Sequence, residues 1–209
     1  MQNAAFAARG LDWAYVACEV APEALKAAFG GLVALGFAGA NVTAPHKEAA
    51  ADLCDEPEGP AVNTLAFRGG RVLGFNTDKA VVAGIEAERV CLIGAGGAAK
   101  ALLPALPGEV RMFSRDADWP PDASDADLIV NATPVRGELL VEPRAGQTVV
   151  DLAYDAGGRA TALVAAARAA GCEVIDGLEA LVRQGAASFE LWTGAPAPVD
   201  VMRAAVRSA

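Results

Sequence analysis

Two short segments of the chain each carry a charged side chain beside hydroxyl and amide groups. Residues 41–47 (NVTAPHK) combine the hydroxyl of Thr43 with the ammonium of Lys47, and residues 74–78 (GFNTD) end in the carboxylate of Asp78. An ammonium and a carboxylate held close together can share proton transfer with an alcohol that loses hydride to a nicotinamide. Each segment also has a structural reading, because Asn-Thr pairs commonly cap turns and lysines are mostly solvated.

A glycine-rich segment lies near the middle of the chain, at residues 90–100 (VCLIGAGGAAK). An apolar strand enters the glycines and an alanine-rich helix leaves them, which is the context of a dinucleotide-binding turn. Gly94 permits the tight turn, Gly96 lets the backbone approach a pyrophosphate, and Ala99 keeps helix and strand close. The alternative is a glycine-rich turn that binds no ligand.

The strand that follows carries the residues expected to select the cofactor. In a dinucleotide-binding fold, the residue that reads the ribose lies at the end of the second strand, about 20 residues after the first glycine. Here Ser114 and Arg115 stand at that position, and Asp116 comes next. A hydroxyl and a guanidinium suit the 2′-phosphate of NADP, whereas a carboxylate would bond the 2′-hydroxyl of NAD. The sequence therefore favours NADP and leaves NAD open through Asp116.

Alternating apolar runs and alanine-rich stretches must position these groups. Such alternation predicts an α/β fold built from βαβ units with a parallel sheet. Helices are expected over residues 22–35, 98–106, 161–170 and 177–193. Strands are expected over residues 13–20, 39–42, 71–75, 90–93, 110–113, 128–131, 148–152 and 173–175.

The composition excludes several classes of protein. The chain has 26 acidic and 17 basic residues, a formal net charge of −9 and no basic run, which argues against nucleic-acid binding. No apolar stretch approaches the roughly 18 residues of a membrane span. His46 is the single histidine and the four cysteines form no CxxC pair, so no metal site is expected. We expect a cytoplasmic protein.

The ordered set of motifs resembles the shikimate dehydrogenase family. The resemblance covers nearly the whole chain and runs through NVTAPHK (41–47), AVNT (61–64), GFNTD (74–78), GAGGAA (94–99), NATP (131–134), DLAY (151–154), LVRQGA (181–186) and FELWTG (189–194). It implies reversible, NADP-linked reduction of 3-dehydroshikimate to shikimate, a step of aromatic amino-acid biosynthesis. It also implies two α/β domains: residues 1–79 plus 178–209 for the substrate, and a Rossmann-type domain at residues 80–177 for NADP.

The same resemblance assigns roles to particular residues. Lys47 and Asp78 would be catalytic, with Lys47 as the proton-transfer group. Hydrogen bonds to the substrate would come from Thr43, Asn63, Asp78, Tyr154 and Gln184. The cofactor would be bound by Gly94, Ala95, Gly96, Gly97, Ala98, Ser114, Arg115, Asn131, Ala132, Thr133 and Gly177. A small-molecule substrate and a monomer or homodimer are expected.

The chain departs from the family pattern in three places. The family opens with a strand and a Ser-x-Ser-Pro loop that holds the substrate carboxylate, whereas residues 1–6 read as the helix that follows them. We expect that the numbering starts at an internal methionine, the alternative being a true truncation. Residues 115–127 are too short for the family's usual helix and strand. Lys79 replaces a usual glycine, and residues 155–158 (DAGG) stand where a proline is usual.

Two other functions compete with this interpretation. One is an NAD-dependent quinate/shikimate dehydrogenase, favoured if Asp116 binds the ribose. The other is a non-catalytic relative that binds a cofactor or a shikimate-like acid. The presence of both Lys47 and Asp78 argues against the binder, since binding alone needs no proton-transfer pair.

Overall fold

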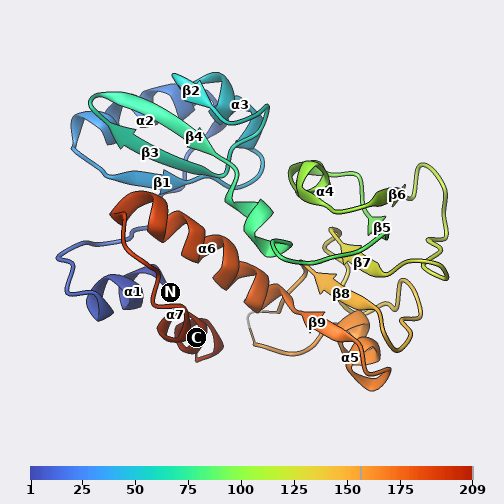
Figure 1. Cartoon of the computed structure of the whole chain (residues 1–209). Coiled ribbons are helices and arrows are strands. Elements are labelled where there is room, and N and C mark those ends of the chain that lie inside the picture. Colours follow the sequence, from blue (N-terminus) through green and yellow to red (C-terminus); the bar gives the residue numbers. More distant parts are fainter. Residues whose placement is uncertain (156, 209) are drawn as a thin grey trace. The chain divides into compact units, whose positions relative to one another are not determined.

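The computed structural model describes residues 1–155 and 157–208, which form two compact units. The first unit comprises Met1–Asp78 and Gln184–Met202 (Figure 1). The second comprises Lys79–Arg183 and the described chain from Arg203 onwards. Each unit contains its own sheet and helices, so the prediction of two α/β domains is confirmed.

The boundaries of the units differ slightly from the expected ones. Residues 178–183 and the described chain after Met202 group with the second unit. Polar contacts inside that unit explain the difference. Arg183 donates to the Val81 carbonyl at 3.0 Å, and Arg203 forms a bidentate pair with Glu179 at 2.8 and 2.9 Å.

The sheet of the first unit has the strand order β1-β3-β4-β2. β1 (Gly39–Asn41) and β4 (Arg71–Phe75) each pair antiparallel with β3 (Thr64–Arg68), and β2 (Glu56–Pro57) pairs parallel with β4. Gly69 and Gly70 join β3 to β4 with φ of 59° and 78°, which a two-residue hairpin loop of this kind requires. The sequence analysis did not predict β3, which begins at the last residue of the AVNT motif.

Helices cover this sheet and supply most of its core. The helices packed on it are α2 (Leu25–Ala34), which η1 (Pro22–Ala24) precedes, and α3 (Lys47–Asp52). α1 (Gln2–Ala8) instead contacts the later chain, with the Phe6 ring stacked on that of Phe189. Buried apolar residues of α2 and α3 pack with those of β3 and β4: Leu25, Phe29, Ala50, Ala51, Leu65 and Val72. The helix expected over residues 22–35 is therefore present as η1 followed by α2.

The prediction of a strand over residues 13–20 is wrong. This segment is extended, but it belongs to neither sheet, and Trp13, Tyr15 and Val16 are 40, 38 and 55% exposed. A strand needs a neighbouring strand to satisfy its backbone hydrogen bonds. At Tyr15 the Asn3 side chain satisfies them instead: the Tyr15 amide donates to Asn3 Oδ1 at 2.6 Å, and Asn3 Nδ2 donates to the Tyr15 carbonyl at 3.0 Å. The segment lines an apolar cavity of about 430 Å³ together with α2 and the edge strand β1.

The second unit contains a parallel sheet with strand order β6-β5-β7-β8-β9. Its strands are β5 (Arg89–Ile93), β6 (Glu109–Phe113), β7 (Leu128–Asn131), β8 (Thr148–Asp151) and β9 (Glu173–Ile175). The chain moves outward from β5 to β6 and then returns to β7 on the other side of β5. This reversal is the topological switch of a doubly wound fold, so the Rossmann-type prediction is confirmed.

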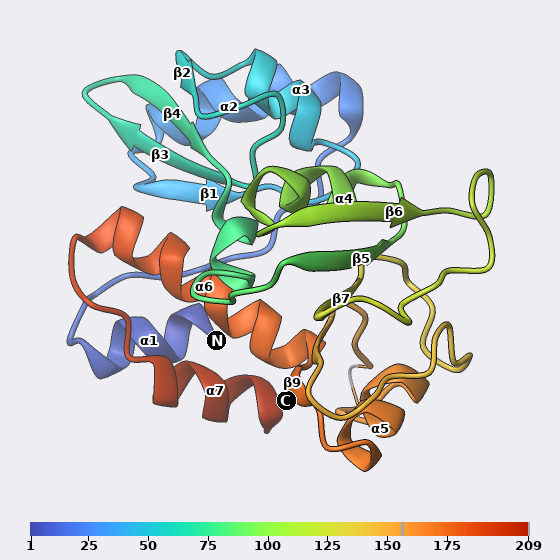
Figure 2. The ribbon, with the colours of Figure 1, turned by 45° about the vertical axis from the view of Figure 1, so that its right-hand side comes forward.

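Both faces of this sheet are buried. Val90 and Leu92 face a cluster that contains residues of α4 (Gly97–Leu102) and α6 (Gly177–Thr193), and η3 (Leu103–Ala105) follows α4. Cys91 and Ile93 face the cluster that contains residues of α5 (Ala162–Ala169), which packs beside β9 (Figure 2). The unit begins within η2 (Thr77–Val81), and α7 (Val199–Arg207) is the last helix. The sequence analysis did not predict α3 or α7.

The link between β6 and β7 is short, as expected. Residues 114–127 contain an isolated bridge and turns but no helix. Ala123 and Ala126 from this link, with Leu140 and Val141 from the next, pack on the α5 face of the sheet. Irregular chain therefore buries apolar surface that a helix would otherwise cover. Within the described residues, no helix is both long and apolar enough to span a membrane.

Candidate active site

Lys47 reaches its position through a turn that follows the edge strand β1. The strand expected over residues 39–42 is present as β1, which ends at Asn41, and Lys47 is the first residue of α3. The amide of His46 donates to the Thr43 carbonyl at 2.9 Å, and the peptide bond between Ala44 and Pro45 is cis. The carbonyl of Lys47 accepts from the Val62 amide at 3.0 Å, which ties the start of α3 to the neighbouring chain.

Asp78 lies in the first turn of η2, three residues after the end of β4. Its backbone amide donates to the Asn76 side-chain oxygen at 3.1 Å, so a local turn fixes the direction of the carboxylate. Thr77, which precedes it, is buried at 3% exposure. The second Asn-Thr pair of the sequence therefore serves as a turn that orients Asp78.

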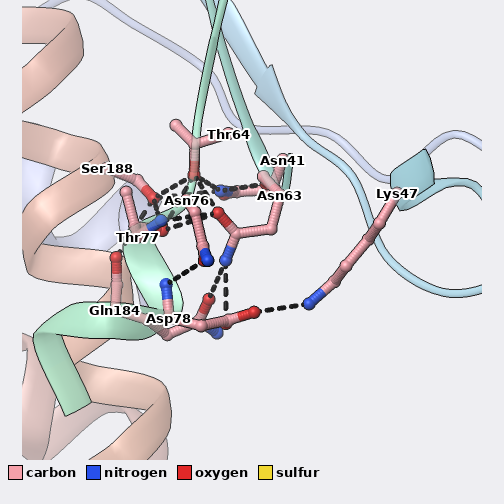
Figure 3. A network of polar contacts seen from close by, with 9 residues as sticks. All are labelled: Asn41, Lys47, Asn63, Thr64, Asn76, Thr77, Asp78, Gln184 and Ser188. Atoms are coloured by element: carbon pink, nitrogen blue, oxygen red, sulfur yellow. Dashed lines mark hydrogen bonds and ion pairs between the residues drawn. The ribbon is translucent and has the colours of Figure 1, made fainter. Parts of the chain in front are cut away.

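The ammonium of Lys47 and the carboxylate of Asp78 form an ion pair (Figure 3). Lys47 Nζ lies 2.6 Å from Asp78 Oδ2, and the two side chains are 20 and 19% exposed. Asn63 Nδ2 donates to the other carboxylate oxygen, Oδ1, at 2.8 Å, and lies 3.4 Å from Gln184 Oε1. Four of the predicted site residues, distant in sequence, are thus in contact within the first unit.

The orientation of the Asn63 carboxamide follows from its partners. Its Oδ1 accepts from the Thr77 backbone amide at 2.8 Å and lies 3.1 and 3.2 Å from the hydroxyls of Thr77 and Thr64. A backbone amide can only donate, so this oxygen must face Thr77. The Asn63 NH₂ group is consequently directed at Asp78 and Gln184.

A layer of buried polar groups lies behind Asn63, and the sequence analysis assigned none of them a role. Ser188 Oγ is 2.9 Å from the Thr64 hydroxyl, 3.2 Å from the Thr77 hydroxyl and 3.0 Å from Asn41 Nδ2 (Figure 3). Three of these residues lie in recognised motifs. Ser188 follows Gln184 by four positions on α6, and this helical spacing is the signal by which it could have been found.

Two predicted substrate residues are not joined to this group by hydrogen bonds among the described residues. Thr43 is exposed and lines the apolar cavity beside β1. Tyr154 belongs to the second unit, where it follows β8 and is 47% exposed. Their roles toward a substrate stay predictions.

The glycine-rich turn of the second unit connects β5 to α4 next to the topological switch. Gly94 has a φ of 115°, which favours glycine, and a Cβ there would lie tightly, 3.2 Å from the Ala132 backbone. A Cβ added at Gly96 or Gly97 would meet no atom within 4 Å. The turn is therefore open at the start of α4, where the amides of Gly97 and Ala98 lack helical acceptors. These features fit a pyrophosphate.

Asn131 has a different position from the one expected of a ligand-binding side chain. It is fully buried, and its Oδ1 accepts from the Thr133 amide and hydroxyl at 3.0 and 2.7 Å. Its Nδ2 donates to Asp151 Oδ1 at 2.8 Å. The Asn131 side chain therefore holds the turn at Ala132 and Thr133. Because both ends of its carboxamide are engaged within the protein, a ligand would contact Ala132 and Thr133 instead.

Asp151 completes this buried group. It accepts from the Thr161 hydroxyl at 2.5 Å and from the Ala153 amide at 3.0 Å. Burial raises the pKa of the Asp151 carboxyl above its ordinary value, and the hydrogen bonds oppose that rise only in part. Gly177, predicted to contact the cofactor, has a packing role here: a Cβ would lie 2.6 Å from the Ala153 carbonyl oxygen.

Arg115 lies at the tip of a tight turn that directly follows β6. Ser114 and Ala117 exchange backbone hydrogen bonds of 2.9 and 3.0 Å, which places Arg115 and Asp116 at the tip. The Arg115 guanidinium is 5.7 Å from the centre of the Trp119 ring and 3.6 Å from Glu138 Oε2. An exposed guanidinium so placed can bind a phosphate, with Glu138 as a competing partner.

Comparisons with known proteins agree with the two-unit fold. Residues 1–66 match the model of the shikimate dehydrogenase substrate binding domain, and residues 177–207 match that of the shikimate 5′-dehydrogenase C-terminal domain. A shikimate dehydrogenase (NADP⁺) of Anaeromyxobacter dehalogenans is 39% identical over 98% of this chain and 89% of its own. One from Methanothermobacter thermautotrophicus is 35% identical over 99% and 90%. The Thermus thermophilus shikimate 5-dehydrogenase structure with NADP(H) and shikimate gives a TM-score of 0.83 at 30% identity, covering 99% of this chain and 92% of that one.

The fold and the site define a two-unit α/β protein with a dinucleotide-type turn in one unit and a lysine–carboxylate pair in the other. The chain belongs to the shikimate dehydrogenase family. The alignment with the Anaeromyxobacter protein extends over 251 positions, more than the 209 residues of this chain. This chain therefore lacks internal segments that its relative has, which agrees with the short link after β6.

Proposed function

We propose that this protein catalyses the reversible, NADP-dependent reduction of 3-dehydroshikimate to shikimate. The observation that carries the proposal is the 2.6 Å pair of Lys47 and Asp78, with Asn63 bonded to the second carboxylate oxygen. Its relatives are named shikimate dehydrogenase (NADP⁺), and the Thermus structure holds NADP(H) and shikimate. The chemistry of the pair suits an alcohol–ketone interconversion.

Lys47 is the proposed proton-transfer group. When bound, the nicotinamide supplies or accepts the hydride at the carbon that bears the oxygen. During reduction the Lys47 ammonium donates a proton to the ketone oxygen, and in the reverse direction the Lys47 amine takes the proton of the hydroxyl. Asp78 holds the Lys47 ammonium in place through the ion pair, while Asn63 holds the second oxygen of Asp78 in place. Thr43, Asn63, Tyr154 and Gln184 are proposed to bind the hydroxyl and carboxylate groups of the substrate.

The proposed cofactor site lies in the second unit. The open glycine turn at Gly94–Ala98 would hold the pyrophosphate, Ser114 and Arg115 the 2′-phosphate, and the turn at Ala132 and Thr133 the nicotinamide end. NADP is preferred because no acidic side chain ends β6 and Arg115 follows it at the tip of the turn. Asn131 and Gly177 are proposed to act by shaping the backbone around the cofactor.

The division of labour between the two parts of the chain is also proposed. Residues 1–79 and 178–209 would bind the substrate and residues 80–177 the cofactor, a proposal supported by the match of residues 1–66 to a substrate binding domain. We further propose a cytoplasmic monomer or homodimer. Its four cysteines are unpaired, as expected in a reducing compartment, and light scattering would determine the oligomeric state.

The direct test is an assay with the purified chain, NADP and shikimate, following the absorbance of NADPH. Quinate and NAD are run in parallel. The expected result is turnover with shikimate and NADP that exceeds every other combination. Turnover that is greatest with quinate or NAD would favour the alternative dehydrogenase. Absence of turnover with every combination, while NADP still binds in a calorimetric titration, would instead establish a non-catalytic binding protein.

A further inference from the structure

The buried polar layer behind Asn63 contains one side chain from helix α6, Ser188. It is fully buried, as is its neighbour Thr64. Ser188 follows Gln184 by one helical turn, and its hydroxyl can donate to the Gln184 carbonyl, which lies 3.1 Å away. Ser188 therefore lies on the helix that carries Gln184 and contacts the residues that surround Asn63.

The direction of the hydrogen bonds can be followed from donor to acceptor. A serine hydroxyl has one proton, which Ser188 can give to the Gln184 carbonyl or to the hydroxyl of Thr64 or Thr77, and its oxygen accepts from neighbours to which it does not donate. One of these neighbours is Asn41 Nδ2 at 3.0 Å. The Asn41 carboxamide cannot be reversed without loss, since its Oδ1 already accepts from the Tyr15 hydroxyl at 3.0 Å. The Ser188 oxygen is thus held as an acceptor of Asn41, and its proton can be given to one of the other neighbours.

The hydroxyls of Thr64 and Thr77 connect Ser188 to the Asn63 carboxamide. Each is within hydrogen-bonding distance of both Ser188 Oγ and Asn63 Oδ1. At the other end of the carboxamide, Asn63 Nδ2 bonds to Asp78 and lies 3.4 Å from Gln184 Oε1. Each threonine hydroxyl has one proton, so a threonine that donates to Asn63 Oδ1 must accept from Ser188. Ser188 therefore acts on Asn63 through a threonine hydroxyl, and it lies one turn after Gln184 on α6.

We propose that Ser188 is a positioning residue: its hydroxyl keeps the Asn63 carboxamide and Gln184 in register, and thereby the carboxylate of Asp78. Ser188 itself touches neither Lys47 nor Asp78. The proposal depends on the proposed function for its kinetic consequences alone, because the contacts that Ser188 organises exist without substrate. It predicts that removal of the buried Ser188 hydroxyl lowers kcat/KM for shikimate and leaves the KM for NADP unchanged.

The variant Ser188→Ala removes the hydroxyl and leaves no buried donor of this layer without an acceptor. Asn41 Nδ2 keeps the Asn63 carbonyl at 3.2 Å and the Thr64 hydroxyl at 3.0 Å, and both threonines keep Asn63 Oδ1. The protein should therefore fold. Its kcat/KM for shikimate should fall about three- to tenfold, the range expected for one net hydrogen bond, while its KM for NADP stays the same.

The chain offers a matched control on the same helix. The hydroxyl of Thr193 also donates to the carbonyl four residues earlier, that of Phe189, at 2.8 Å, and it makes no contact with the site. Thr193→Ala should leave kcat/KM for shikimate at the parent value. A loss in Ser188→Ala that Thr193→Ala reproduces would mean that both hydroxyls merely stabilise α6, and the proposal would be wrong.

A second measurement does not require turnover. In proton–nitrogen NMR spectra of the labelled protein, the Asn63 side-chain NH₂ signals can be assigned by their disappearance in Asn63→Asp. Ser188→Ala should shift these signals and speed their exchange with water, whereas Thr193→Ala should not. Unchanged Asn63 signals in Ser188→Ala overturn the positioning role. If the parent fails to oxidise shikimate, the proposed function fails, and this spectrum still decides the role of Ser188.

Discussion

The ammonium nitrogen of Lys47 lies 2.6 Å from Asp78 Oδ2, although 31 positions separate the two residues in the chain. Each partner is set by its own local structure, Lys47 by the first turn of α3 and Asp78 by the Asn76 turn. Asn63 Nδ2 donates to the other carboxylate oxygen of Asp78. The pair is half-buried, so its attraction is screened less than that of a surface pair while a substrate can still reach it.

Lys47→Ala should lower kcat by about 10²–10⁴-fold, the usual contribution of a placed proton-transfer group. Binding of NADP should hardly change, because the glycine turn lies in the other unit. Steady-state kinetics with shikimate and a calorimetric titration with NADP measure the two effects. Lys26→Ala, at an exposed position on α2, is the control. Turnover of Lys47→Ala at the parent rate would show that another group moves the proton.

Asp78→Asn should reduce kcat by a similar order, since the neutral amide cannot form the ion pair that holds Lys47 in place. Because the two residues act as one unit, the double variant should be little worse than the poorer single variant. The measurement is a double-mutant cycle in kcat. Independent roles would instead make the two losses multiply.

Arg115→Ala should weaken NADP binding by roughly tenfold or more, which is typical of a charge-assisted contact to phosphate, and should leave NAD binding unchanged. Glu138→Gln should have the opposite effect on NADP, because it removes the carboxylate that lies 3.6 Å from Arg115. Titrations of both cofactors into each variant measure these changes.

The control for this pair of variants is Arg71→Ala, which removes an exposed arginine of the first unit that is ion-paired with Glu56. It should change neither affinity. If the parent bound NADP and NAD equally, the assignment of Arg115 to the 2′-phosphate would be incorrect.

Asp151 should make stability depend on pH. Burial raises the pKa of its carboxyl above the ordinary 3.8, so between these two values the native protein binds more protons than the unfolded chain. The contribution of Asp151 to the free energy of unfolding is therefore largest below the ordinary value and is lost as pH rises through the raised one. Asp151→Asn cannot ionise and should lack this component of the pH dependence.

Urea unfolding of the parent and Asp151→Asn over a pH series tests this expectation, with the exposed Asp52→Asn as the control. The Asp151 variant should also be less stable by about 1–3 kcal/mol, because an amide cannot accept hydrogen bonds at both of its ends. Parallel pH curves for the parent and Asp151→Asn would contradict the prediction.

The sequence by itself determined the elements whose signals are local. The strand and glycine turn at residues 90–97 were predictable because a tight turn that approaches a backbone accepts little besides glycine. The helix at Gly177–Thr193 was predictable because its apolar residues recur with helical spacing over a long segment. The family motifs also identified Lys47, Asp78, Asn63 and Gln184, four residues that lie together in the structure.

Only the tertiary structure decided which polar group faces which partner. Residues 13–20 have strand-like composition but form no strand, since pairing depends on a neighbour that no local pattern encodes. Asn131 is conspicuous in its motif, yet its side chain holds Thr133 and Asp151. Ser188 carries no signal except its spacing from Gln184, and its contacts come from β1, β3 and η2. Hydrogen bonds between distant segments depend on how the chain packs, and local sequence does not specify that packing.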